Sequence, residues 1–193
     1  RSDLKAALDS LPLLRGDVVF CHANIGYFGR AEGIEGADAL CTMFVDAIMD
    51  RIGPQGTLCV PTFTYSFPRG EVFDPKNTPS KMGAFAEWVR AEGHRSNDPC
   101  YSVAAVGAEA RNLVVGVAEN SFDARASFFA RFASEGGKVL NLNFDAGSTF
   151  VHWVERKLNV PYRFDKVFRG TIKQGLGIEL PAWSTIFVHY RHP

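Results

Sequence analysis

Apolar and polar residues follow two different periods along this chain, one typical of helices and the other of strands. Apolar residues recur at helical spacing in several segments, and we therefore predict helices at 3–11, 37–52, 82–93, 108–116, 126–137 and 149–158. Short apolar runs bounded by polar or turn-forming residues predict strands at 17–22, 57–63, 100–107 and 138–144. Helix and strand alternate up to Val160, and this alternation favours an α/β fold.

The last part of the chain follows a different pattern. Strand-like runs dominate over residues 166–193, and the letters "QGLG" between them indicate the turn of a β-hairpin. We therefore predict a layered α/β sandwich with a central mixed sheet flanked by helices and an appended antiparallel hairpin. The segment "TYSFPRGEVFDPKNTPS" at 64–80 predicts a long ordered loop, and such loops inside compact domains are often functional.

Composition fits one domain with a sizeable core. The chain has 193 residues, of which 46% are apolar, including 16 Phe and 3 Trp. Lys and Arg together number 21, as do Asp and Glu, so the formal net charge is zero. Nucleic-acid-binding proteins usually carry a basic excess, so this balance argues against that class. A charged ligand would need a local cluster of opposite charge.

The cysteines predict a protein that works in a reducing compartment. Their positions are Cys21, Cys41, Cys59 and Cys100, and no C-x-x-C pair suggests a zinc ribbon or a thioredoxin motif. We therefore expect no metal. No secretion signal or run of membrane-spanning length is recognisable, so we expect a cytoplasmic protein that does not enter a membrane.

The helix predicted at 149–158 carries a histidine and a glutamate three residues apart. His152 and Glu155 can meet at this i,i+3 spacing, so that Glu155 orients the imidazole ring for proton transfer. The alternative is a surface histidine with an incidental ion pair. We expect Phe150, Val151 and Val154, with Leu158, to form the apolar stripe of this helix.

Two further segments carry candidate chemistry, each with a plain structural alternative. In "CHANIG", after the first strand, His22 is a candidate base or ligand, and Asn24 and Gly26 are candidates to line a ligand. The alternative for His22 is a turn histidine bonded to the backbone. In "HRSNDPCYS", Arg95 with its neighbouring hydroxyls can hold a phosphate or a carbonyl group. The alternative is a capped turn, because Asn-Asp-Pro is strong turn chemistry.

Several acidic side chains and one thiol complete the candidates. Asp98, Asp74 and Glu71 can attract an amine, although solvated loop charges are commoner. Cys100 is a candidate nucleophile, but Arg95 is the only electropositive neighbour that the sequence shows.

Several of these segments, taken in order, resemble the aminoglycoside 3-N-acetyltransferase family, also called the antibiotic N-acetyltransferases. The matching segments are "GDVVFCHANIGYFG", "GPQGTLCVPTFTY", "FDP", "HRSNDPCYSVAAVG", "GKVLNLNF" and "STFVHWVERKLNVPYR". The resemblance implies an acetyl-CoA-dependent N-acetyltransferase with an α/β fold unlike that of the commoner acetyltransferase superfamily. It also implies one domain over 1–193, without part of the C-terminal structure that family members usually have.

The resemblance implies roles for individual residues. Family members place a T-x-x-H-x-x-E helix at the active site, matched here by Thr149, His152 and Glu155, so His152 and Glu155 are the expected catalytic residues. The turn of His22, Ala23, Asn24, Ile25 and Gly26 and the segment with Arg95, Ser96 and Ser102 are expected to border CoA. Asp74, Asp98 and Glu71 are the expected contacts of the amine.

Departures from the family pattern affect the acceptor more than the reaction. Many members have R-S-x-H-P where this chain has "RSNDP", with Asp98 in the histidine position. The acceptor is therefore an aminoglycoside or, alternatively, an amino sugar or a nucleotide-linked amine of a biosynthetic pathway. A non-catalytic CoA-binding relative is a third reading, and an oligomer is compatible with all of them. A hydrolase using His22 and a serine ranks last, because no G-x-S-x-G elbow is present.

Overall fold

The computed structural model describes residues 2–29 and 31–190, and the last three residues of the predicted hairpin region lie outside that description. The helices are α1 (Ser2–Asp9), α2 (Gly36–Ile52), α3 (Ala84–Glu92), α4 (Ala110–Val114), α5 (Phe128–Ser134) and α6 (Phe150–Lys157). The strands are β1 (Val18–Ala23), β2 (Thr57–Pro61), β3 (His94–Arg95), β4 (Val103–Gly107), β5 (Lys138–Leu142), β6 (Arg163–Lys173) and β7 (Glu179–His189). Short 3₁₀ helices are η1 (Ile25–Phe28), η2 (Phe67–Arg69) and η3 (Gly175–Gly177).

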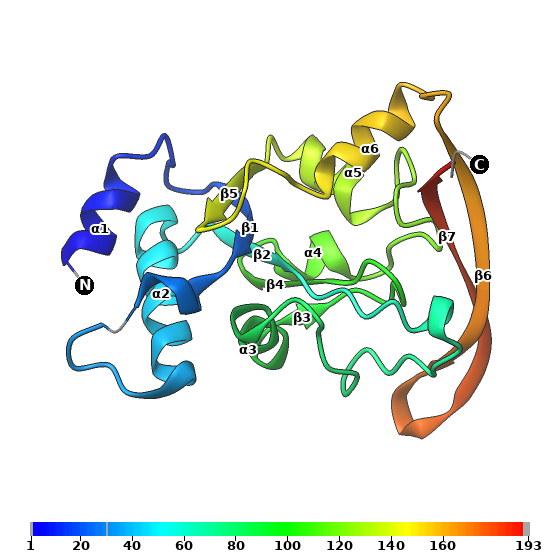
Figure 1. Ribbon diagram of the computed structural model, residues 1–193, viewed down its shortest axis with the longest axis horizontal. Coiled ribbons are helices and arrows are strands. Elements are labelled where there is room, and N and C mark those ends of the chain that lie inside the picture. Colours follow the sequence, from blue (N-terminus) through cyan, green and yellow to red (C-terminus); the bar gives the residue numbers. More distant parts are fainter. Residues whose placement is uncertain (1, 30, 191–193) are drawn as a thin grey trace.

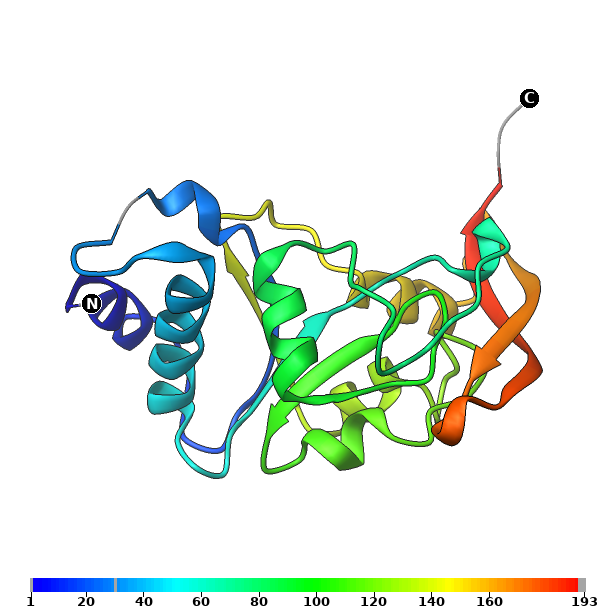
Figure 2. The ribbon, with the colours of Figure 1, turned by 90° about the horizontal axis from the view of Figure 1, so that it is seen from below.

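A mixed sheet forms the centre of the molecule, as predicted. Its strand order is β3-β4-β2-β1-β5. Strand β1 runs parallel to β2 and to β5, whereas β4 runs antiparallel to both β2 and β3. Figure 1 shows α1 and α2 at one end of the molecule and the β6–β7 hairpin at the other, and the turned view of Figure 2 agrees. The predicted α/β class and the appended hairpin are confirmed.

Both faces of the sheet are buried, which explains the continuous apolar runs of its central strands. Alternate residues of β1 enter different cores: Phe20 packs with α4, α5 and α6, and Val19 packs with α1, α2 and α3. Both side chains are fully buried. At about 25 cal/mol per Å² of apolar surface, burying one such side chain stabilises the fold by roughly 2 kcal/mol.

The hairpin is joined to the body by backbone hydrogen bonds. Phe73 donates from its N–H to Thr171 O at 2.9 Å and accepts at its carbonyl from Lys173 N at 2.8 Å. Gly170 faces the ring of Phe67 so closely that a Cβ atom there would lie 2.5 Å from it. A side chain at position 170 would therefore push the hairpin away from the loop that contains Phe67.

Helix α6 differs from the prediction in the face that it buries. Phe150 and Val154 pack against the core as predicted, but Val151 is 47% exposed and Leu158 is 72% exposed, so these two members of the predicted stripe are wrong. The buried residue of this helix is Trp153, and its ring stacks on Phe150 at 5.4 Å. The packed face therefore follows Phe150, Trp153 and Val154, because an aromatic ring at the middle position buries more apolar area than Val151 would.

Candidate active site

One cleft of about 430 Å³ lies where the three parallel strands end. Strand β1 contributes His22 and Ala23, and β2 contributes Pro61 as its last residue. The start of α6 adds its own residues, including His152. Ligands of α/β proteins bind at the carboxyl ends of such strands, so the position of this cleft is typical of an active site.

The predicted contact between His152 and Glu155 is present. His152 Nδ1 lies 2.7 Å from Glu155 Oε2, and the imidazole ring packs edge-on against Phe122 at 5.6 Å. His152 lines the cleft, so one wall of the cleft carries an imidazole ring whose orientation is fixed by Glu155. Because Nδ1 is taken by the carboxylate, Nε2 is the ring atom left for a ligand.

Glu155 is held by three partners at once. Besides His152, it accepts a hydrogen bond from Tyr162 Oη at 3.1 Å, and Arg163 Nε lies 2.7 Å from Oε2. The Arg163 contact is a charge pair whose N–H does not point along the line of a hydrogen bond. Burial raises the pKa of Glu155, but the bonds from His152 and Tyr162 and the Arg163 charge outweigh it, and the net pKa is lowered. Glu155 is therefore a carboxylate at neutral pH.

His22 forms a second imidazole contact in the same cleft. Its Nε2 lies 2.9 Å from Ser148 Oγ, although 126 positions separate the two residues. The ring packs between Phe20, edge-on at 4.7 Å, and Phe144, stacked at 5.3 Å. Burial lowers the pKa of His22 to about 4, so the imidazole is neutral at pH 7.

The depressed pKa of His22 makes stability depend on pH. Between pH 6.5 and about 4 the unfolded chain binds a proton that the folded chain does not, so the free energy of unfolding falls as pH falls through this window. We expect His22→Gln to lose about 2 kcal/mol of this pH dependence. Urea unfolding of both proteins at pH 7 and pH 4.5 measures it. If the free energy of unfolding fell by the same amount between pH 7 and pH 4.5 in wild type and variant, the lowered pKa of His22 would be contradicted.

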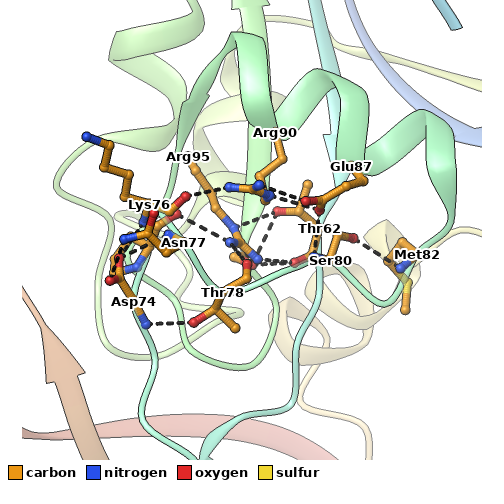
Figure 3. Close-up of polar contacts among 12 residues, drawn as sticks. Thr62, Asp74, Lys76, Asn77, Thr78, Ser80, Met82, Glu87, Arg90 and Arg95 are labelled. Atoms are coloured by element: carbon orange, nitrogen blue, oxygen red, sulfur yellow. Dashed lines mark hydrogen bonds and ion pairs between the residues drawn. The ribbon is translucent and has the colours of Figure 1, made fainter. Parts of the chain in front are cut away.

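Arg95 lies away from the cleft and bonds to the loop that follows β2. Its guanidinium donates to the carbonyl of Thr62 at 2.7 Å, of Thr78 at 2.6 Å and of Pro75 at 3.3 Å. Its Nε also donates to the hydroxyls of Thr62 and Ser102, each at 3.2 Å. Figure 3 shows Arg95 extended into this loop, between Thr62 and Thr78. The donors expected to meet CoA are therefore occupied by the protein's own oxygen atoms.

The hydroxyls beside Arg95 are buried as well. Ser96 Oγ accepts from Val103 N at 3.0 Å, and Ser102 Oγ donates to Thr62 O at 2.7 Å. Asp98 accepts from the backbone N–H of Cys100 at 2.8 Å and of Tyr101 at 2.9 Å. These side chains build a buried turn and do not line the cleft of His152.

Burial also shifts the pKa values of two side chains in this turn. It raises the pKa of the Asp98 carboxyl and of the Cys100 thiol, and it fully removes Cys100 from solvent. A thiol kept neutral and inaccessible is a poor nucleophile. The candidate nucleophile of the sequence is therefore a core residue.

The loop acids also have local partners. Asp74 accepts from Lys76 N at 2.9 Å and from the Asn77 side chain at 2.8 Å, contacts that Figure 3 shows. Glu71 pairs with Arg69 at 2.6 Å on an exposed surface. Asp74 lines a separate polar groove of about 660 Å³. Glu71, Asp74 and Asp98 are therefore not brought together with His152.

The turn after β1 is divided between the cleft and the core. His22 and Ala23 line the cleft, whereas Asn24 and Gly26 are exposed beside it. Ile25 is buried with α2 in the core, so its side chain is turned away from any ligand.

Among the cleft residues that were absent from the predicted ligand contacts, three carry hydroxyl groups: Tyr65, Ser148 and Thr149. The T-x-x-H-x-x-E pattern contains Thr149, and Ser148 directly precedes it. The sequence signal for these two was their place at the start of the histidine helix. Tyr65 carried only the general signal of an aromatic residue in a long loop.

The described residues contain neither a candidate metal site nor a candidate membrane-spanning helix. No group of His, Cys, Asp or Glu side chains within 2–29 and 31–190 is arranged to hold a metal ion. Within the same ranges, no helix combines the length and apolar character needed to cross a membrane.

Comparisons with known proteins agree with this architecture. The family model described as aminoglycoside 3-N-acetyltransferase matches residues 20–187. Among solved structures, the chain is similar to aminoglycoside acetyltransferase AAC(3)-Xa, with 24% identity and a TM-score of 0.79 over 96% of this chain and 70% of that one.

Two other solved structures have the same fold. "AAC-IIIb binary with CoASH" is 23% identical, with a TM-score of 0.80 over 98% of this chain and 75% of the other. The YokD protein from Bacillus subtilis is 21% identical, with a TM-score of 0.80 over 98% of this chain and 82% of the other.

Proposed function

We propose, because this chain belongs to the aminoglycoside 3-N-acetyltransferase family, that it transfers an acetyl group from acetyl-CoA to a primary amine of an aminoglycoside or a related amino sugar. The observation that carries the proposal is the 2.7 Å contact between His152 and Glu155 at the wall of the cleft. It supplies an oriented imidazole where the three parallel strands end.

His152 is the general base in this mechanism. An alkyl amine is protonated at neutral pH and cannot attack a thioester until it loses a proton. His152 Nε2 takes that proton, directly or through one water, while Nδ1–H donates to Glu155. Glu155 is ionised, so it fixes the tautomer of His152 and stabilises the imidazolium that forms. The amine then attacks the thioester carbon, the C–S bond breaks, and the second proton that the nitrogen loses passes to the departing CoA sulfur, so that the amide and the CoA thiol form.

The start of α6 supplies donors for the oxyanion that forms during this attack. Ser148 and Thr149 line the cleft beside His152 and carry hydroxyl groups. Backbone N–H groups at the start of a helix add a partial positive charge. Ser102 is not assigned to this role, because it does not line the cleft and its hydroxyl donates to Thr62 O.

The coenzyme arm is placed along the turn after β1. His22 and Ala23 line the cleft and the exposed Asn24 and Gly26 continue it outward, so the thioester end can reach His152 from this side. We assign Arg95, Ser96 and Ser102 to the support of the loop, because their polar atoms are bonded within the protein. The described cysteines are free thiols, which fits a cytoplasmic protein.

A thiol-release assay with acetyl-CoA and a panel of amines tests the proposed reaction. Sisomicin, which a relative in this fold is named as binding, represents the aminoglycosides, and glucosamine represents a single amino sugar. A nucleotide-linked amino sugar tests the biosynthetic alternative. Release of CoA that depends on the amine supports the proposal. Tight binding of CoA in calorimetry without turnover on any amine would indicate a non-catalytic relative.

We expect Glu155→Gln to lower kcat by about 10- to 100-fold, because a neutral amide orients the ring but stabilises an imidazolium poorly. The KM for acetyl-CoA should stay unchanged. Glu109→Gln is a matched control, since Glu109 bonds to Asn112 on the surface. Unchanged kcat in Glu155→Gln would show that the carboxylate charge takes no part in the reaction.

A further inference from the structure

Tyr65 has an unusual backbone conformation for an aromatic residue. Its φ is +53°, in the left-handed region that non-glycine residues rarely adopt. The other non-glycine residues with positive φ in the described chain are Asn143 and Asn159, and asparagine tolerates this region well. Such conformations are costly and persist where the surrounding structure enforces them, often at ligand sites.

The residues on either side of Tyr65 enforce its conformation. Thr64 and Ser66 are both fully buried, and both bond to the carbonyl of Pro99. Thr64 Oγ1 donates to it at 2.9 Å and Ser66 N donates to it at 3.0 Å, while Ser66 Oγ donates to Thr64 Oγ1 at 2.9 Å. With its neighbours fixed in this way, Tyr65 is the residue of the three whose side chain reaches the cleft.

The Tyr65 ring belongs to an aromatic wall of that cleft. It packs edge-on against Tyr101 at 5.6 Å and against Phe63 at 6.2 Å, and Phe63 also lines the cleft. The same cleft contains the His152 imidazole. A left-handed backbone therefore holds an aromatic ring in the space where the proposed base acts.

We propose that Tyr65 determines acceptor specificity by packing its ring against the apolar C–H face of the acceptor's sugar ring. This rests on the function proposed above. Sugar rings present such a face beside their hydroxyls, and aromatic side chains are the usual apolar walls of ligand pockets. The turn after β1 is assigned to the coenzyme, and the 62–82 loop supplies an apolar wall of Phe63, Tyr65 and Met82 that is available to the acceptor.

The backbone part of the inference is tested by comparing Tyr65→Gly with Tyr65→Ala. Both variants lose the ring, but only glycine adopts positive φ without strain. We expect the glycine variant to melt about 2–4 °C higher than the alanine variant. Tyr27 is a matched control, because it is exposed and has negative φ, and alanine should be at least as stable as glycine there. A lower melting temperature for Tyr65→Gly would overturn the claim of strain.

The proposed contact of Tyr65 with the acceptor is tested by calorimetric titration with sisomicin and with glucosamine. Where turnover occurs, the KM for the acceptor provides a second measurement. We expect Tyr65→Ala and Tyr65→Gly to weaken acceptor binding about tenfold or more, and Tyr65→Phe to stay near wild type. The KM for acetyl-CoA should not change.

The first three of the following outcomes test the role of Tyr65 separately from the proposed reaction. Sisomicin binding without turnover would overturn the proposed reaction but leave the role of Tyr65 standing if Tyr65→Ala still weakens that binding. Equal acceptor affinity in wild type and Tyr65→Ala overturns the role of Tyr65. A higher KM for acetyl-CoA with unchanged acceptor binding would instead place Tyr65 against the coenzyme and also overturn it. Absence of binding by the wild type to either amine overturns both proposals.

Discussion

His152→Ala is expected to lower kcat for acetyl transfer by about 10²–10⁴-fold, the usual contribution of a general base. The variant removes the imidazole that lines the cleft, whose Nε2 is the ring nitrogen not bonded to Glu155. An ammonium group then has no acceptor for its proton beside the thioester. The affinity for CoA should survive, since the expected coenzyme contacts lie on the turn after β1.

Two measurements separate loss of the base from loss of the fold. Calorimetry with CoA should give the same affinity for wild type and His152→Ala, and circular dichroism should give the same spectrum. His94→Ala is the matched control, because His94 is an exposed histidine in the short strand β3. Near-normal turnover of His152→Ala with any amine would show that another group takes the proton.

The fold could be predicted from sequence where a pattern is local and long. Short apolar runs identified the strands β1, β2, β4 and β5, and "QGLG" identified the turn between β6 and β7. The two-residue strand β3 was not predicted, since it exists only through pairing with β4. The predicted buried face of α6 was wrong at Val151 and Leu158 and lacked Trp153, because eight residues give little periodicity and the Trp153 ring determines which face packs.

In the candidate site, too, contacts within one helix could be predicted and contacts that depend on tertiary structure could not. The contact of His152 with Glu155 follows from i,i+3 spacing in one helix, so the sequence predicts it. The contact of His22 with Ser148 depends on the parallel pairing of β1 with β5, which single-sequence patterns do not specify. The left-handed backbone of Tyr65 arises from the bonds of its neighbours to Pro99, which only tertiary structure brings near.

Arg95→Met should be the most destabilising change among the candidate residues, with a loss of about 3 kcal/mol in the free energy of unfolding. The variant keeps much of the side-chain volume but leaves the carbonyls of Pro75 and Thr78 without the donors that Arg95 supplies, and the Thr62 carbonyl keeps only its bond from Ser102. The guanidinium also lies 5.2 Å from the centre of the Phe73 ring. Burial lowers the pKa of Arg95 to about 10, so the group is still charged at pH 7.

Urea unfolding at pH 7 measures this loss, and Arg131→Met provides the matched control. Arg131 also donates to three carbonyls, those of Asn112, Val115 and Gly116, but at the surface, where water replaces the lost bonds. We expect Arg131→Met to lose about 1 kcal/mol or less. Similar losses in the two variants would mean that burial of the Arg95 bonds has no special weight. If Arg95 holds the loop that carries Phe63 and Tyr65, Arg95→Met should lose more free energy of unfolding than Arg131→Met. The same variant should also bind the acceptor more weakly.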